Sequence, residues 1–242
     1  INALSERHDS ALCAKMDQAV EWLLDHEVRE AGDWREKNPP GPIGGWYFEY
    51  NNEFYPDVDD TAQILTAGST FQIGSADLDH RWNEAAQRAV DWMLSMQNRD
   101  GGWASFDRGC DKVFLTYIPF ADHNAMIDPS TTDITARVVE ALCRSGHERS
   151  SAAVRGGIRF LLREPEPDGS WYGRWGCNYL YGTFLAMGAL EVAGSGDAER
   201  EAIARGAEWI RSVQNPDGGW GESPESYRDP SLKGVGPSTP SQ

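Results

Sequence analysis

Three carboxylates fall within four positions, at Asp57, Asp59 and Asp60. Neighbouring anions oppose one another's ionisation and burial opposes it further, so such a cluster can keep one carboxyl group protonated near neutral pH. A protonated carboxyl group in a dry pocket can act as a proton donor. The alternative is a helix cap, in which Asp57 or Asp59 accepts from the first backbone N–H groups of the apolar helix that Thr61 continues.

Glycine–tryptophan turns recur along the chain and share an Asp-Gly step shortly before the tryptophan. Asp-Gly favours a left-handed turn at a helix end, after which the tryptophan folds back. A glutamine ahead of the turn could then bond the end of a neighbouring helix, although the middle copy has Pro165 in that place. These repeats stabilise the fold before they serve catalysis. We assign the following residues to this structural role: Gln97, Trp103, Trp171, Gln214 and Trp220.

Composition excludes some classes of protein. The 242 residues carry 22 Lys and Arg against 38 Asp and Glu, a formal charge of −16, which argues against a nucleic-acid partner because phosphates would repel the chain. No stretch approaches the roughly 20 apolar residues of a spanning helix, so any membrane contact comes from one side. The four cysteines form no CxxC pair, which indicates neither a zinc site nor a disulfide framework and fits a reducing cytoplasm.

The elements that position these residues are helical. Apolar residues recur with helical period, no alternating strand pattern competes, and the longest loop, 101–130, is of a length that is usually functional. The sequence therefore predicts a single all-α domain spanning 1–242. The helices are expected over residues 11–30, 61–71, 82–96, 133–143, 152–162, 180–192 and 198–213.

The DxDD run, the aromatic approach from Gly44 to Tyr50 and the QW-type repeats together resemble the squalene-hopene cyclases, a family of class II triterpene cyclases. In that family the middle aspartate protonates a terminal alkene and starts a cationic ring-forming cascade. The resemblance assigns this role to Asp59, with Asp57 and Asp60 as electrostatic neighbours. It implies an isomerase that converts squalene to hopene, or a lyase on the branch to hopanol.

The same resemblance implies an α/α barrel built from helical hairpins. The chain opens on Ile1 and closes on a phrase that runs on into a further helix in the family. We therefore expect residues 1–242 to be an incomplete fragment of a longer two-domain cyclase, with little or no turnover of its own.

An alkene is a feeble base, so the site must strengthen its acid by stabilising the carboxylate that remains. Asp133 and Arg137 stand one helical turn apart on one face, in a segment similar to the one that hydrogen-bonds the acid in the family. The alternative is a helix cap at Thr132 or Asp133 with an ordinary surface ion pair. Some relatives have histidine where Arg137 stands, which puts a proton-relay role there in doubt.

A carbocation is held without being quenched by aromatic faces, each worth about 0.5 to 2 kcal/mol. For any single aromatic residue, ordinary core packing is the alternative. The residues in segments similar to the cavity lining of the family are Phe48, Phe106, Phe120, Trp175 and Tyr181.

Aspartate clusters also hold Mg²⁺ in other terpene synthases. Here the cluster opens a helix and has no phosphate loop or lysine cluster beside it, so we expect neither metal nor cofactor. The partners implied are squalene and, from one side, the cytoplasmic face of the cell membrane, and a homodimer is left open. The alternatives are a class II cyclase of a diterpene or sesquarterpene substrate, and a helical barrel without catalysis.

Overall fold

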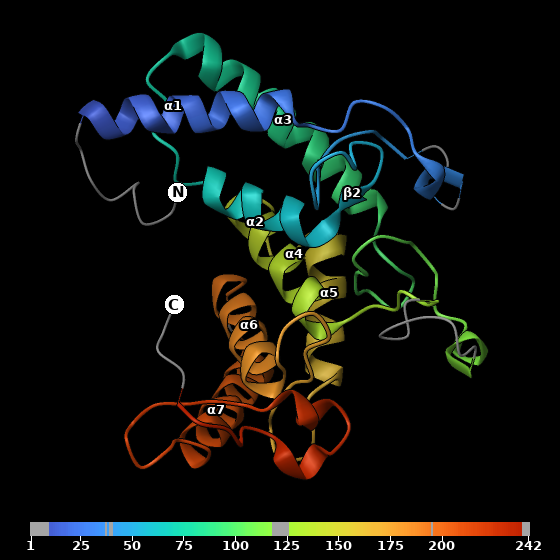
Figure 1. Ribbon diagram of the computed structural model, residues 1–242, viewed down its shortest axis with the longest axis vertical. Helices are drawn as coiled ribbons and strands as arrows, with labels where there is room; N and C mark the ends of the chain where they lie inside the picture. The colour runs from blue at the N-terminus through green and yellow to red at the C-terminus, as the bar shows by residue number, and fades with distance from the viewer. Residues whose placement is uncertain (1–9, 37, 39–40, 118–125, 195, 239–242) are drawn as a thin grey trace. The chain divides into compact units, whose positions relative to one another are not determined.

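A computed structural model describes residues 10–36, 38, 41–117, 126–194 and 196–238 of the chain (Figure 1). The predicted all-α class is confirmed, and a helix lies in every range where one is expected. The helices are α1 (Ser10–Asp25), α2 (Val58–Gly68), α3 (Ala76–Ser95), α4 (Thr132–Arg144), α5 (Ala152–Arg163), α6 (Tyr179–Val192) and α7 (Asp197–Ser212). Short 3₁₀ helices are η1 (Asp33–Glu36), η2 (Val113–Tyr117), η4 (Pro224–Tyr227) and η5 (Pro230–Leu232).

Two differences from the predicted elements have local causes. Helix α3 begins at Ala76 rather than at 82, because the Ser75 hydroxyl accepts the Leu78 N–H at 3.1 Å and caps a polar first turn. Strands β1 (Trp46–Tyr47) and β2 (Pro56–Asp57) form an antiparallel pair. Two residues are too few to show an alternating pattern, so these strands could not be predicted from the sequence.

The chain divides into two compact units, each described by itself. Unit 1 contains Ile1–Arg99, Trp103–Ser130 and Arg144–His147, and in it α1 and α2 both pack against α3. Unit 2 contains Asp100–Gly102, Thr131–Cys143 and Glu148–Gln242, and in it α5, α6 and α7 pack against one another. Large buried side chains form each core: in unit 1, Trp34, Trp46, Trp82, Trp92, Met93 and Trp103; in unit 2, Ile134, Leu142, Leu161, Trp171 and Leu190.

Three glycine–tryptophan turns share one geometry. In each, an aspartate Oδ1 accepts the N–H two positions further on at 3.0 Å. The glycine between them has φ of +93°, +93° or +85°, which residues with a Cβ rarely adopt. The indole N–H then donates at 2.8 Å to a carbonyl ten residues earlier, in the last turns of the preceding helix. The pairs are Trp103 with Met93, Trp171 with Leu161 and Trp220 with Ile210.

The glutamine of the last turn does not reach a neighbouring helix as expected. The Gln214 side chain donates to the Gly218 carbonyl of its own turn at 2.7 Å. In the copy that has Pro165 instead, the Arg205 guanidinium donates to the Pro167 carbonyl at 2.7 Å and ties the turn to α7. In this copy of the repeat, the side-chain hydrogen bond between the turn and another helix therefore comes from an arginine.

A fourth turn of this kind lies at Gly44-Gly45-Trp46, which sequence analysis treated only as an aromatic approach. The Trp46 indole donates at 2.7 Å to the Leu23 carbonyl in α1. A Cβ at Gly44 would lie 2.6 Å from the Arg88 carbonyl oxygen of α3, so only glycine allows this approach. The signal was missed because 23 residues, rather than ten, separate this indole from its acceptor.

In three of the four turns, the glycine two positions before the tryptophan packs against the second helix after the turn, which is α3, α5 or α7. A Cβ at Gly101 would lie 2.6 Å from the Gly156 carbonyl oxygen, and one at Gly169 would lie 3.0 Å from the Arg205 backbone. A Cβ at Gly218 would meet no described atom within 4 Å. Backbone-to-backbone packing is thus the common function of this position, and the last turn lacks a partner for it among the described residues.

Two of the tryptophans also fix the helix that follows them. The Trp46 N–H donates to the Thr61 hydroxyl of α2, and the Trp171 N–H donates to the Thr183 hydroxyl of α6, both at 2.9 Å. Both threonines are fully buried. Each hydroxyl therefore fixes the position of the first turns of its helix relative to the tryptophan turn.

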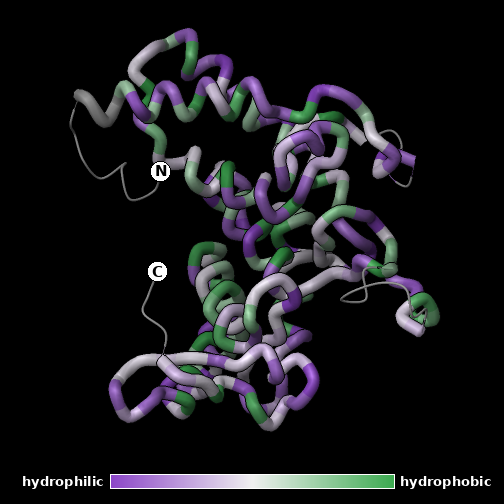
Figure 2. Tube along the Cα trace, in the orientation of Figure 1, coloured by the Kyte–Doolittle hydropathy of each residue, from purple (hydrophilic) through white to green (hydrophobic). Residues whose placement is uncertain are grey.

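Helix α6 is the most apolar of the seven, as its colouring in Figure 2 shows. Over the described part of the chain, none of the helices combines the length and the hydropathy needed to cross a bilayer.

Candidate active site

The aspartate cluster lies at the start of α2, where the two readings of the sequence turn out to concern different residues. Asp57 is the N-cap: its Oδ1 accepts the Asp59 N–H at 2.6 Å and the Asp60 N–H at 3.4 Å. It ends β2 opposite Trp46 and is only 6% exposed. Asp59 and Asp60 follow in the first turn of α2, half-buried, with their side chains not used for the cap.

Burial, together with the charges of Asp60 and Asp59, raises the pKa of Asp57 to about 7, against the opposing effect of the two backbone N–H hydrogen bonds. The charges of Asp60 and Asp59 are coupled to this titration, and the Asp57 carboxyl group is partly protonated near neutral pH. That is the electrostatic condition for a carboxylic acid that donates protons.

The loop after Trp103 is fastened to the start of α2 by an aspartate that sequence analysis missed. Asp128 is buried, and its carboxylate accepts the N–H groups of Ser105 (3.3 Å), Phe106 (2.6 Å) and Asp107 (2.8 Å). The Ser105 carbonyl in turn accepts the N–H of Val58, the first residue of α2, at 2.9 Å. The only available signal was an aspartate directly before Pro129, which is a common way to begin a turn.

Phe106 and Tyr55 lie beside each other in this part of unit 1, with ring centroids 5.8 Å apart. The Tyr55 hydroxyl donates to Asp107 at 3.2 Å, and burial together with that carboxylate raises the pKa of Tyr55. Tyr55 thus stays a neutral phenol next to a ring proposed to hold positive charge. In the sequence, the sign that Tyr55 belongs to the site was its position directly before Pro56 and Asp57.

Phe48 follows β1 and is 55% exposed in the described chain. The loop after it contains two non-glycine residues with left-handed backbone, Glu49 (φ +73°) and Asn51 (φ +67°). Such conformations persist where surrounding structure imposes them and are common near functional sites. Ordinary core packing is wrong for Phe48, and it is wrong for Trp175, which is 46% exposed.

The second group of predicted residues lies in unit 2. Asp133 is fully buried in the first turn of α4, so the alternative of a surface ion pair is wrong for it. Its Oδ2 accepts the N–H groups of Arg174 (2.8 Å) and Trp175 (2.7 Å), and its Oδ1 accepts the Ile134 N–H at 3.1 Å. Asp133 therefore fixes the backbone of the loop that carries Trp175.

Arg137, one turn further along α4, contacts Tyr181 of α6. Its Nη2 donates to the Tyr181 hydroxyl at 3.2 Å, and its guanidinium carbon lies 5.8 Å from the ring centroid. The structure thus brings Asp133, Arg137, Trp175 and Tyr181 into one cluster. Asp59 belongs to the other unit, so a hydrogen bond between it and this cluster stays a prediction.

Three of the predicted polar site residues share one position in the repeat. Each stands two residues before a threonine in the first turns of its helix, and two of those threonines bind the N–H of a turn tryptophan. The repeat therefore provides one equivalent position for a site residue near the start of every second helix. The pairs are Asp59 with Thr61 in α2, Asp133 with Thr135 in α4 and Tyr181 with Thr183 in α6.

Phe120 lies outside the described residues. Among the residues that are described, no group of three or more His, Cys, Asp or Glu side chains is arranged to hold a metal ion.

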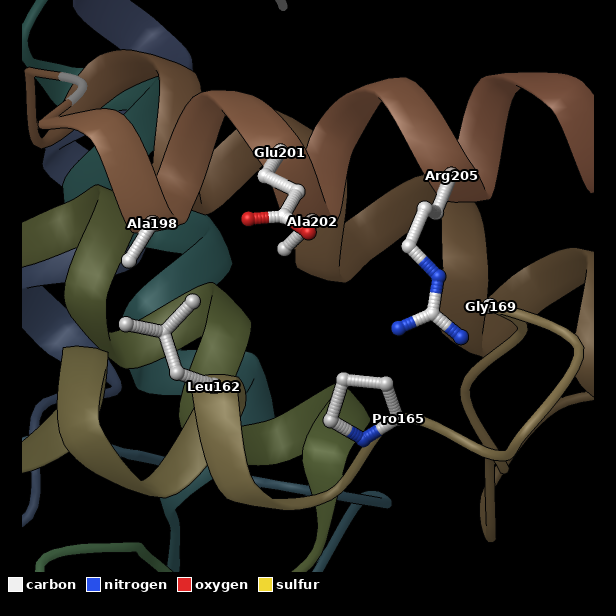
Figure 3. A pocket seen from close by; sticks show the side chains of 7 residues that line it. All are labelled: Leu162, Pro165, Gly169, Ala198, Glu201, Ala202 and Arg205. Atoms are coloured by element: carbon white, nitrogen blue, oxygen red, sulfur yellow. The ribbon is translucent and has the colours of Figure 1, made fainter.

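A cavity of about 250 Å³ in unit 2 contains none of the predicted site residues. It lies between the C-terminal end of α5 and one face of α7. Figure 3 shows Glu201 and Arg205 extending from α7 toward Leu162 and Pro165. A carboxylate and a guanidinium at its wall make it a poor site for a hydrocarbon.

The family described as squalene-hopene cyclase C-terminal domain matches residues 1–242. The chain is 43% identical to a probable squalene–hopene cyclase from Sinorhizobium fredii over 100% of this chain and 37% of that protein. It is 41% identical to the squalene–hopene cyclase of Zymomonas mobilis over 86% of this chain and 32% of that protein. The chain thus spans about a third of the length of these curated relatives.

A solved structure has the same fold. A variant of the type II terpene cyclase MstE from Scytonema, in complex with the product merosterolic acid A, superposes with a TM-score of 0.57 at 21% identity, over 89% of this chain and 54% of that chain. This likeness supports the α/α-barrel class predicted for the helices.

Proposed function

Because the chain belongs to the family of squalene-hopene cyclase C-terminal domains, we propose that the protein is a class II terpene cyclase in which Asp59 protonates a terminal alkene. One observation carries the proposal: the aspartate cluster at the start of α2 is buried enough to raise the pKa of Asp57 to about 7. A cluster that holds a proton at neutral pH can deliver it to a substrate without help from solvent.

In the proposed reaction, the Asp59 O–H proton forms a C–H bond with one alkene carbon and the O–H electrons stay on the carboxylate. The other alkene carbon becomes a tertiary cation, and neighbouring double bonds attack it in turn to close rings. The last cation loses a C–H proton to give hopene, or it adds water and the resulting oxonium ion loses a proton to solvent to give hopanol. The donor role is proposed for Asp59 from the family resemblance, while Asp57 accepts two backbone N–H groups of α2 through its Oδ1.

Aromatic rings are proposed to stabilise the cations, and the two units supply them from fixed loops. Asp128 accepts the Phe106 N–H at 2.6 Å, and Asp133 accepts the Trp175 N–H at 2.7 Å, so both backbones are held in place. A ring on an immobilised backbone presents its face without a reorganisation cost during the reaction. These contacts support the roles given to Phe106 and Trp175.

We propose squalene as the substrate, with a diterpene or sesquarterpene polyene as the alternative. The isolated 242-residue chain is expected to have little turnover, since Phe48 and Trp175 are about half exposed in it and water would quench a cation there. We also propose one-sided attachment to the cytoplasmic face of the cell membrane, which the exposed apolar side chains of η2 support.

The test is incubation of the full-length protein with squalene in detergent and EDTA, with analysis of cyclic products. We expect hopene or hopanol, and we expect Asp59→Asn to lower the rate by at least about 100-fold because a general acid is lost. Asp77→Asn is the matched control, since Asp77 is an exposed aspartate in the first turn of α3.

Loss of product in both variants would show a general effect on the protein, and retained activity in Asp59→Asn would refute the assignment. Product that needs added Mg²⁺ would refute metal independence. Cyclisation of a shorter polyene but not of squalene would support Asp59 as the acid and would replace squalene by that polyene as the substrate.

A further inference from the structure

Helix α6 carries Tyr181 but does not cap its own N-terminus. Asn178 occupies the cap position with no side-chain bond to the helix. It is fully buried and turns away, with its Oδ1 accepting the Gly173 N–H at 3.3 Å and its Nδ2 donating to Ser226 at 3.4 Å. The first turn of α6 also has no acidic residue. The first backbone N–H groups of α6 have no acceptor within the helix, so they need one from another part of the chain.

That acceptor is Glu222, in the loop after the last turn tryptophan. Its Oε2 accepts the Leu180 N–H at 2.8 Å and the Asn178 N–H at 3.3 Å. A carboxylate at a helix N-terminus makes charge-assisted hydrogen bonds and interacts favourably with the helix dipole. The other oxygen, Oε1, is buried with no hydrogen-bond partner among the described residues, so the carboxylate is committed to α6.

The same loop also fixes the segment beneath the Tyr181 ring. The Tyr227 hydroxyl, at the end of η4, donates to the Gly176 carbonyl at 2.7 Å. A Cβ at Gly176 would lie 2.6 Å from the Tyr181 ring, which shows how closely the ring rests on this segment. Glu222 thus supports Tyr181 through its helix, and Tyr227 supports it through the backbone under its ring.

From this geometry we propose that Glu222 is a positioning residue of the active site, which sets the first turn of α6 so that the Tyr181 hydroxyl meets Arg137. The inference rests on the proposed function for its catalytic consequence. Its structural part, the capping of α6 by a carboxylate 42 residues further along the chain, stands on the hydrogen bonds alone. Glu222 follows Trp220 by two residues, as Phe48 follows Trp46. The position two residues after the turn tryptophan thus holds a proposed cation-binding residue in the first turn and the proposed positioning residue in the last.

The experiment compares Glu222→Ala and Glu222→Gln with Glu225→Ala in the full-length protein, well below the melting temperature. Glu225 is exposed three residues further on, where it makes only a 3.9 Å pair with Arg228. Amide hydrogen exchange at the first turn of α6 and kcat and KM with squalene are measured for each. Glutamine keeps an oxygen that can accept both N–H groups, whereas alanine removes it.

We expect Glu222→Ala to speed exchange at the α6 start by roughly tenfold or more, as loss of a charge-assisted hydrogen bond implies. We expect kcat to fall by a similar factor with KM little changed, Glu222→Gln to recover most of both, and Glu225→Ala to match the native protein. Unchanged exchange in Glu222→Ala, or a kcat equal to that of Glu225→Ala, would overturn the proposal. A native protein that cyclises no polyene would refute the proposed function, while exchange at α6 would still decide whether Glu222 caps the helix.

Discussion

Asp57 meets two demands that act on its charge in opposite directions. As the N-cap of α2 it accepts two backbone N–H groups, which favour the carboxylate. Burial and the neighbouring carboxylates favour the neutral acid, and they prevail, since the pKa is raised to about 7. From the sequence, a shared proton and a helix cap were competing explanations. In the structure Asp57 is both the cap and the carboxyl group of raised pKa, so the two explanations are compatible, and Asp59 as the donor stays a proposal.

Asp57→Asn should change how stability depends on pH. The folded pKa of about 7 lies above the value of about 3.9 expected in the unfolded chain, so the folded state loses stability as pH rises between these values and the loss is complete above the folded pKa. The penalty is on the order of a few kcal/mol, at about 1.4 kcal/mol per pH unit. Asparagine keeps an oxygen for the cap and has no charge to bury.

The melting temperature of the variant relative to the native protein should therefore rise from about pH 5 to about pH 8. Thermal melts in matched buffers of constant ionic strength measure it. Parallel melting curves for the two proteins over this range would show that Asp57 is not a buried acid of raised pKa.

At the scale of elements, the four glycine–tryptophan turns determine where the site residues stand. Each turn ends a helix with an indole hydrogen bond, and two of them bind a threonine of the next helix through the tryptophan N–H. The position two residues before the threonine holds Asp59, Asp133 or Tyr181. The repeat thus places polar groups at equivalent points of α2, α4 and α6, which are alternate helices of the chain.

Gly101→Ala and Gly218→Ala separate the two costs of changing a turn glycine. Both have left-handed backbone, so both lose about 1 to 2 kcal/mol from strain. A Cβ at Gly101 would also lie 2.6 Å from the Gly156 carbonyl oxygen, whereas one at Gly218 would meet no described atom within 4 Å. Denaturant unfolding should show Gly101→Ala to be less stable than Gly218→Ala by a further 1 to 3 kcal/mol, roughly the cost of overpacking. Equal losses would mean that the turn at Gly101 does not pack on α5.

The elements were predictable to the extent that their signals are local. Helical periodicity located all seven helices, and Asp-Gly followed by tryptophan located three turns. The turn at Trp46 was missed because its acceptor lies 23 residues away. Asp128 and Glu222 were missed for the same reason, since each carboxylate binds backbone N–H groups some 20 to 40 residues from it, a choice that only the packed structure makes.

At the scale of the whole molecule, the proposed substrate is a hydrocarbon that dissolves in membranes and not in water. The 3₁₀ helix η2 has three exposed apolar side chains in five residues: Val113, Phe114 and Tyr117, at 64%, 65% and 83% exposure. Exposed apolar groups gathered on one short turn are typical of contact with a partner or a membrane. With a net charge of −16, the chain should prefer uncharged lipid to anionic lipid.

Phe114→Ser should therefore weaken binding of the full-length protein to phosphatidylcholine vesicles by roughly tenfold, the value of one aromatic side chain moved out of lipid. Vesicle flotation measures the bound fraction. Tyr117→Ser and Tyr50→Ser form a matched pair, because the two tyrosines are 83% and 81% exposed but only the first lies in η2. Equal binding by this pair would place the membrane contact elsewhere.

The central claim is that a proton from the aspartate cluster starts the cyclisation, and the most direct measurement is the mass of the product formed in D₂O. In D₂O the cluster carries deuterium, so the account predicts that each hopene molecule made from squalene gains one deuterium on carbon. Asp59→Asn should yield no such product. Hopene without carbon-bound deuterium would contradict initiation by an exchangeable acid, and labelled hopene from Asp59→Asn would place that acid elsewhere in the site.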